Sequence, residues 1–119
     1  MPTLERVQAF IQRVEMHDFS GAVAHFYHDD VLVQENFGDI RQGRDALLAH
    51  EVDLIARYGK TPVRKVENFA VNGDLVFINW VFDLSKGGEP RTFDEVTMQR
   101  WRGDRVAFER FYYDPAQLR

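Results

Sequence analysis

The stretch VNGDLVFINWVFDL, residues 71–84, decides the fold class of this chain. Its Asn72-Gly73 step tolerates the positive φ angles of a tight hairpin, so we expect residues 63–71 and 75–84 to pair as antiparallel strands. Successive side chains of a strand point to opposite faces, and the even positions of the second strand are all apolar. We expect these positions to face a layer of helices: Val76, Ile78, Trp80, Phe82 and Leu84.

Two short helices are predicted near the start of the chain, and a longer helix is predicted between them and the hairpin. Apolar residues recur at i, i+3, i+7 and i+10 from Leu4, which predicts a first helix with Thr3 as its N-cap. Asp18 is placed to cap a second helix that ends near residues 29–30. The longer helix is predicted over residues 44–58, because a glycine follows it and a proline prevents its continuation.

Strands fill the rest of the chain. Alternating patterns between turn residues predict them over residues 31–36, 91–101 and 105–113. The order α-α-β-α-β-β-β-β predicts an α+β fold, in which N-terminal helices pack on a curved antiparallel β-sheet and enclose one pocket. The odd positions of residues 75–84 are mostly apolar too, which indicates a homodimer formed through the β-sheet.

Length and composition exclude several functional classes. The 119 residues have the length of one domain, which we place at residues 1–119. The net charge of −4 argues against nucleic acid as a partner. Apolar runs of no more than four residues argue against a membrane partner, and the start shows no secretion signal. The absence of cysteine excludes disulfides and thiolate catalysis, and we expect a cytoplasmic protein.

The last two predicted strands are expected to line the pocket with their odd positions. These positions mix large aromatic side chains with isolated polar groups, as a pocket wall does, whereas the even positions carry three arginines. The odd positions of the first of these strands are Phe93, Glu95, Thr97, Gln99 and Trp101, and those of the second are Ala107, Glu109, Phe111 and Tyr113.

Three glutamates are the candidate acid–base groups. If Glu35, at the end of an apolar strand, points inward, burial raises its pKa, and it can accept a proton from a C–H beside a carbonyl or from water. Glu95 and Glu109 would then titrate together with it, so that one carboxyl stays protonated while another ionises. The alternatives are a solvent-exposed Glu35, and salt bridges from the other two glutamates to arginines.

For the remaining polar candidates, a structural or surface role is an alternative to a functional one. Thr97 and Gln99 either orient a substrate oxygen or fasten the sheet. His25 and His28 lack a convincing third ligand, so no metal site is predicted. Two further histidines are expected on the surface: His17 and His50.

Six short segments together carry a resemblance to a known superfamily. They are DFSGAVAHFYHDDV at 18–31, QEN at 34–36, GRDAL at 43–47, FDEV at 93–96, QRW at 99–101 and ERFYYDP at 109–115. They resemble the SnoaL-like branch of the nuclear transport factor 2-like superfamily, which includes ketosteroid isomerases and polyketide cyclases. The resemblance implies a cone-shaped fold with one deep, mostly apolar pocket, usually in a dimer. It leaves the activity open, because one fold hosts many functions.

The resemblance also suggests roles for single residues. The steroid isomerases of this superfamily use a carboxylate on the first strand, and Glu35 occupies the matching position. Their oxyanion donors, a tyrosine on the first helix and a protonated aspartate on a late strand, correspond here to Phe10 (or Val14) and Thr97. Phe10 has no donor, and Thr97 is a weaker donor than a carboxylic acid, so a true steroid isomerase is not expected.

We therefore expect a small-molecule pocket protein, a cofactor-independent isomerase, cyclase or dehydratase that moves a proton on an apolar, carbonyl-bearing metabolite. Glu35 would be the catalytic base or acid, and Glu95 its partner. The expected substrate-binding residues are Phe10, Val14, Trp80, Phe82, Thr97, Gln99, Glu109, Phe111 and Tyr113. Two alternatives stay open: a non-catalytic binder of a small ligand, and a structural dimerisation domain whose pocket is filled by its own side chains.

Overall fold

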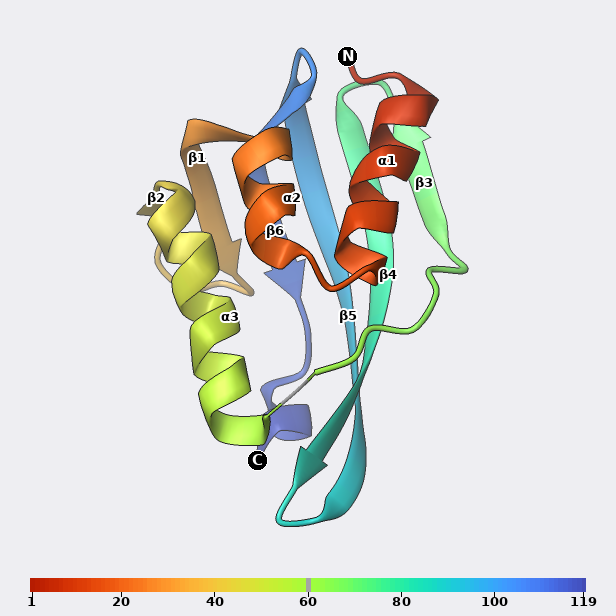
Figure 1. The fold of residues 1–119 in the computed structure, drawn as a ribbon. Coiled ribbons are helices and arrows are strands. Elements are labelled where there is room, and N and C mark those ends of the chain that lie inside the picture. Colours follow the sequence, from red (N-terminus) through yellow and green to blue (C-terminus); the bar gives the residue numbers. More distant parts are fainter. Residues whose placement is uncertain (60) are drawn as a thin grey trace.

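Helices cover one face of a mixed β-sheet (Figure 1). The computed structural model describes residues 1–59 and 61–119. Over these residues the sheet has the strand order β2-β1-β6-β5-β4-β3. The strands are β1 (Tyr27–Glu35), β2 (Arg41–Gln42), β3 (Phe69–Asn72), β4 (Leu75–Lys86), β5 (Glu89–Arg102) and β6 (Arg105–Tyr112), and a short 3-10 helix, η1 (Pro115–Leu118), follows them.

The first two helices begin at the side chains predicted to cap them. The Thr3 hydroxyl accepts a hydrogen bond from the Arg6 amide at 3.1 Å and starts α1 (Leu4–Glu15). Asp18 starts α2 (Phe19–Phe26) in the same way, accepting from a backbone amide of the first turn at 3.0 Å. Each side chain thus satisfies an amide that has no partner within the helix.

The third helix, α3 (Arg44–Tyr58), has the predicted bounds. It lies between two glycines with positive φ angles, Gly43 at 103° and Gly59 at 73°. Residues that carry a side chain rarely adopt such φ angles, so glycine is suited to both ends of the helix. The helix packs toward β1, β4 and α2, which completes the helical layer in Figure 1.

The expectation of an antiparallel sheet is corrected at one pair of strands. β1 pairs with β6 in parallel, with Glu35 opposite Phe111, whereas the other neighbouring strands of the described sheet are antiparallel. Hairpins enforce antiparallel pairing only between strands that follow each other along the chain. β1 and β6 are instead joined by a long connection, which allows the two strands to pair in parallel. The predicted α+β class and the N-terminal helices are confirmed.

The second helix ends, and the first strand begins, earlier than predicted. α2 ends at Phe26 rather than near residues 29–30, and β1 begins at Tyr27 rather than at residue 31. Tyr27 pairs with Val106 of β6, and its ring is buried in the core. Tertiary pairing and burial therefore override the local helical pattern at this residue.

The predicted strand over residues 63–71 is mostly an irregular segment. Only β3 is regular, and before it a single bridge joins Val63 to Phe82 of β4. One cause is the Val66 amide, which donates to the carboxylate of Glu15 on α1 at 2.7 Å instead of to a strand. The Asn72-Gly73 hairpin itself is confirmed, with Gly73 at a φ of 61°.

The final strand contains an irregularity that shifts one predicted face. Arg100 pairs with Phe108, but Trp101 pairs with Val106, so Ala107 is left without a partner. Val106 is consequently fully buried, whereas Ala107, expected to point inward, is only half-buried. Beyond this bulge the predicted alternation holds, and both Glu109 and Phe111 are buried.

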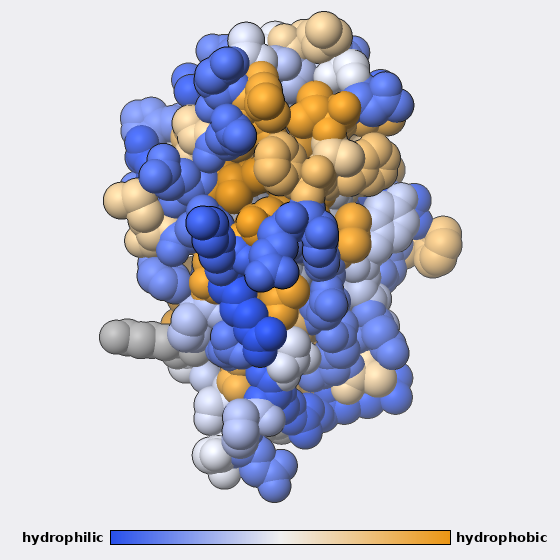
Figure 2. Space-filling model, turned by 90° about the vertical axis from the view of Figure 1, so that its right-hand side faces the viewer, coloured by the Kyte–Doolittle hydropathy of each residue, from blue (hydrophilic) through white to orange (hydrophobic). Residues whose placement is uncertain are grey.

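The outer face of the sheet carries apolar side chains that the helices do not cover. Phe77 of β4 and Val96 of β5 each keep 38% of their surface exposed on this face. Figure 2, which looks at the side of the molecule bearing β3, shows apolar side chains gathered in its upper half and hydrophilic ones below. Among the described helices, none combines the length and apolarity needed to cross a membrane.

Candidate functional site

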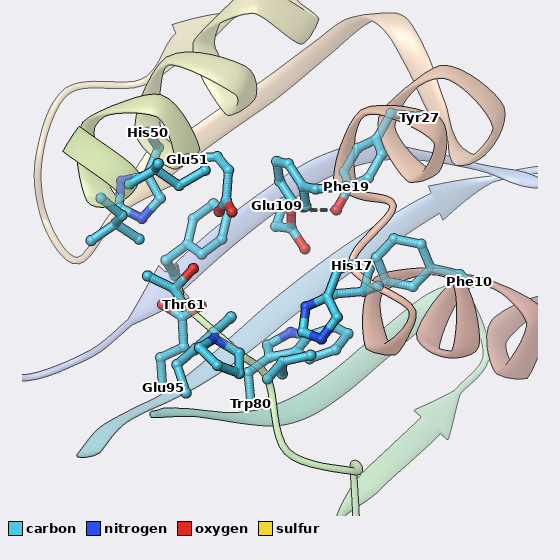
Figure 3. Close-up of a pocket in the computed structure, with 17 residues that line it drawn as sticks. Phe10, His17, Phe19, Tyr27, His50, Glu51, Thr61, Trp80, Glu95 and Glu109 are labelled. Carbon is cyan, nitrogen blue, oxygen red and sulfur yellow. Dashed lines mark hydrogen bonds between the residues drawn. The ribbon is translucent and has the colours of Figure 1, made fainter. Parts of the chain in front are cut away.

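A cavity lies between the helices and the inner face of the sheet (Figure 3). Its volume is about 450 Å³, which is within the range of small-ligand sites and argues against a pocket filled by its own side chains. The described aromatic side chains that line it are Phe10, Phe19, Tyr27, Trp80, Phe82 and Phe111. The described polar lining residues are His17, His50, Glu51, Thr61, Glu95 and Glu109, and the other lining residues are Val14, Leu54, Ile55, Pro62 and Val63.

Phe10 of α1 anchors the aromatic part of this wall. Its ring meets those of Tyr27 and Trp80 edge-on, with centroids 5.7 and 6.1 Å apart. The indole Nε1 of Trp80 donates to the Thr97 hydroxyl at 3.0 Å. Edge-to-face packing and a satisfied indole fix these rings in place, so the wall is preformed rather than created by a ligand.

Glu109 is the most elaborately held polar group in the cavity. Only 2% of it is exposed, and its oxygens accept hydrogen bonds from the Tyr27 hydroxyl and from Nε2 of Gln99, each at 2.6 Å. The Gln99 amide is oriented by Trp101, whose Nε1 donates to Oε1 of Gln99 at 3.0 Å. Burial raises the pKa of Glu109 to about 7, although both hydrogen bonds pull it down. Figure 3 shows the bond between Tyr27 and Glu109.

Glu95 is buried without comparable support. It is 5% exposed, and its Oε2 has no hydrogen-bond partner among the described residues. Burial, and next the charge of Glu109, hold the pKa of Glu95 well above its ordinary value. The two carboxyls therefore differ in their surroundings: two hydrogen-bond donors offset the effect of burial on the pKa of Glu109, whereas Glu95 has no described donor to its Oε2.

Glu35 lies at the edge of the site, in contact with a histidine expected on the surface. It pairs with Nδ1 of His50 from α3, which lowers the pKa of Glu35 more than partial burial raises it. The expected raised pKa of Glu35 is therefore wrong, because the partner outweighs the lost hydration. His50 is also misplaced by the prediction: its ring packs on Phe111, with centroids 5.5 Å apart, and lines the cavity.

The other expected substrate-binding residues divide into two groups. Phe10, Val14, Trp80, Phe82, Glu109 and Phe111 line the cavity. Thr97, Gln99 and Tyr113 are absent from the described lining and lie behind it, which fits their supporting role. Thr97 and Gln99 hold Trp80 and Glu109, as given above, and Tyr113 packs on Phe93 with ring centroids 5.3 Å apart.

The sequence reasoning missed several lining residues, and some of them left a signal. Glu51 and His50 lie between the buried Leu47 and Leu54, at helical spacing, so the inward side of α3 could have included them. Burial raises the pKa of Glu51 as well. Tyr27 left no such signal, because the residue was assigned to the helix. His17 is exposed, as expected, and also lines the cavity from the turn after α1.

Comparisons with known proteins agree with this geometry. The family model described as the SnoaL-like domain matches residues 7–109. A SnoaL-like protein of Mesorhizobium loti, provisionally named a polyketide cyclase, is 26% identical, with a TM-score of 0.80 over 95% of this chain and 100% of that one.

Two other solved structures share the fold at lower identity. A SnoaL-like protein of Jannaschia sp. CCS1, also provisionally named a polyketide cyclase, is 14% identical, with a TM-score of 0.83 over 99% of this chain and 92% of that one. A similarly named protein of Xanthomonas campestris is 18% identical, with a TM-score of 0.80 over 96% and 91% of the two chains. No curated protein matches the sequence.

Proposed function

This chain belongs to the SnoaL-like domain family, and we propose that it catalyses a cofactor-independent proton transfer on an apolar, carbonyl-bearing metabolite. The reaction class is an isomerisation, a cyclisation or a dehydration. The observation that carries the proposal is the pair of buried carboxyls, Glu95 and Glu109, in one largely apolar cavity. Two donors offset the effect of burial at Glu109 and none does so at Oε2 of Glu95, and such a difference in environment is how acid and base roles are separated between two carboxyls.

In the proposed reaction Glu109 is the base and Glu95 the acid. Ionised Glu109 removes a proton from the carbon beside the substrate carbonyl, while protonated Glu95 donates to the carbonyl oxygen, so that an enol forms. Glu109 then delivers the proton to another atom of the substrate, and the proton on the oxygen returns to Glu95. No net proton is consumed in an isomerisation of this kind.

Glu35 takes a different place in this proposal from the one expected. Its ordinary form is ionised, because the contact with His50 lowers its pKa. We assign it the task of orienting His50 at the edge of the cavity, whereas the base is Glu109. Tyr27 and Gln99 are positioning residues, because they hold the Glu109 carboxylate toward the cavity through the bonds described above.

The remaining sequence-based predictions enter the proposal unchanged. We propose one domain over residues 1–119, acting in the cytoplasm as a homodimer through the outer face of the sheet. The uncovered apolar side chains of that face, such as Phe77 and Val96, support the dimer. Light scattering during size-exclusion chromatography measures it, and a monomer at high micromolar concentration would contradict it.

Hydrogen–deuterium exchange into 2-tetralone, an apolar bicyclic ketone, tests the catalytic proposal. The protein should accelerate exchange of the protons beside the carbonyl, followed by NMR, and the rate should rise as the pH passes about 7, where Glu109 ionises. Glu109→Gln should remove the acceleration, whereas Glu89→Gln, at an exposed position, should retain it. Binding of 2-tetralone without faster exchange would indicate the non-catalytic binder instead.

A further inference from the structure

The Glu109 carboxyl is held by two hydrogen-bond donors, yet the described lining offers it no arginine or lysine. Its two donors, Tyr27 and Gln99, are both neutral. The described lining residues that can become positive are two histidines, and one of these, His50, is already paired with Glu35. Buried carboxylates in proteins are normally paired with a cation or a metal. Over the described residues, the cavity therefore supplies the acidic partner of an ion pair but no lysine or arginine to complete it.

Glu95 gives an independent indication of the same kind. Its side chain is more than nine-tenths buried, lines the cavity, and has an oxygen without a hydrogen-bond partner among the described residues. Buried polar atoms in proteins are almost always satisfied, so an unpartnered oxygen on a residue that lines the cavity points to a ligand atom that binds there. A third carboxyl, Glu51, approaches the same cavity from α3.

The walls suit an organic cation better than an inorganic one. Phe10 and Trp80 (Figure 3), and also Phe111, line the same cavity as the carboxyls. Aromatic faces attract ammonium groups, and the apolar walls bind the hydrocarbon skeleton that carries such a group. A ligand with a carboxylate or a phosphate would instead meet like charges and no described lysine or arginine.

We infer that the cavity binds an apolar organic cation, a protonated or quaternary amine on an aromatic or alicyclic skeleton, with its charge between Glu95 and Glu109. The inference goes beyond the proposed reaction and rests on the cavity alone.

Binding of a cation and ionisation of the carboxyls should favour each other. A positive charge beside Glu95 and Glu109 stabilises their ionised forms, so binding releases protons and becomes tighter as the pH rises through about 7. The other described titratable groups that face the cavity are Tyr27, Glu51, His17 and His50. Burial raises the pKa of Glu51, and this carboxyl likewise gains negative charge as the pH rises.

Calorimetry with two ligands of one skeleton tests the inference: 2-aminotetralin, which is a cation at neutral pH, and 2-tetralol, which is neutral. At pH 7.5 we expect the amine to bind at least tenfold tighter than the alcohol, and most of this preference to disappear at pH 5. Parallel titrations in phosphate and Tris buffers should show proton release with the amine only. Glu95→Gln and Glu109→Gln should each reduce the preference while alcohol binding stays within about twofold, and Glu89→Gln should change neither.

Several results would overturn the inference. These are equal affinities of the wild-type protein for the two ligands, a preference that survives both substitutions, and no binding of the amine at millimolar concentration. The wild-type comparison of pH 5 with pH 7.5 decides the question even if a variant does not fold. A preference for the amine without exchange into 2-tetralone would refute the proposed reaction and leave the inferred ligand class standing.

Discussion

Replacement of Glu109 by glutamine measures how strongly the fold resists ionisation of this carboxyl. Its pKa rises from an ordinary 4.5 to about 7 in the folded protein. The folded state therefore binds the proton more tightly than the unfolded state does. Stability from this group is complete below pH 4.5 and is lost as the pH rises through 7. At about 1.4 kcal/mol per pKa unit, the loss reaches about 3 kcal/mol by about pH 8.

Urea unfolding of the wild type and of Glu109→Gln, at intervals from pH 4.5 to 8, tests this figure. The glutamine keeps the shape of the side chain and can still accept from Gln99, while the Tyr27 hydroxyl can turn to accept from the new amide. We expect the free energy of unfolding of the variant, relative to that of the wild type, to increase by about 3 kcal/mol between pH 4.5 and pH 8. An exposed control, Glu89→Gln, should gain nothing. A constant difference between the two proteins would refute the reasoning.

Three further substitutions address the groups around the site. Tyr27→Phe removes a hydrogen bond worth about 1.5–3 kcal/mol to a charged acceptor, so the pKa of Glu109 should rise by about one unit or more. NMR titration of labelled glutamates measures this pKa, and an unchanged titration of Glu109 would contradict the hydrogen bond. In the same experiment His50→Gln should raise the pKa of Glu35, and no rise would show that the pair does not form in solution. Asn36→Ala should cost about 1–2 kcal/mol in urea unfolding, because Asn36 has a φ of 50° and its Oδ1 accepts a hydrogen bond from the Tyr113 amide at 2.9 Å. Asn36→Gly loses the same hydrogen bond without the backbone strain and should cost less, so equal losses would argue against strain.

The parts of the fold that follow from local patterns were predictable. The caps at Thr3 and Asp18, the bounds of α3 and the hairpin at Asn72-Gly73 each depend on a few neighbouring residues. The end of α2 at Phe26 was not, because Tyr27 becomes a strand residue only through its pairing with Val106. The bulge at Ala107 likewise follows from the register of β5 against β6, which no single segment contains.

The site was predictable from alternation where strands supply it. Glu95 and Glu109 are buried as their positions on β5 and β6 indicate. The state of Glu35 was not predictable, because it depends on His50 from α3, and alternation along a strand carries no information about the helix packed on it. Glu109 depends in the same way on Tyr27, which is 82 positions away in the sequence.

The place of β6 in the sheet has a consequence for folding during synthesis. β6 is the last strand described, yet it separates β1 and β2 from β3, β4 and β5. A nascent chain still lacking residues 105–112 would hold two unjoined fragments of sheet, each with an open hydrogen-bonding edge, and Tyr27 would have no carboxylate to hold. Open edges of this kind favour aggregation, so we expect a deletion at this strand to yield insoluble protein rather than an inactive folded one.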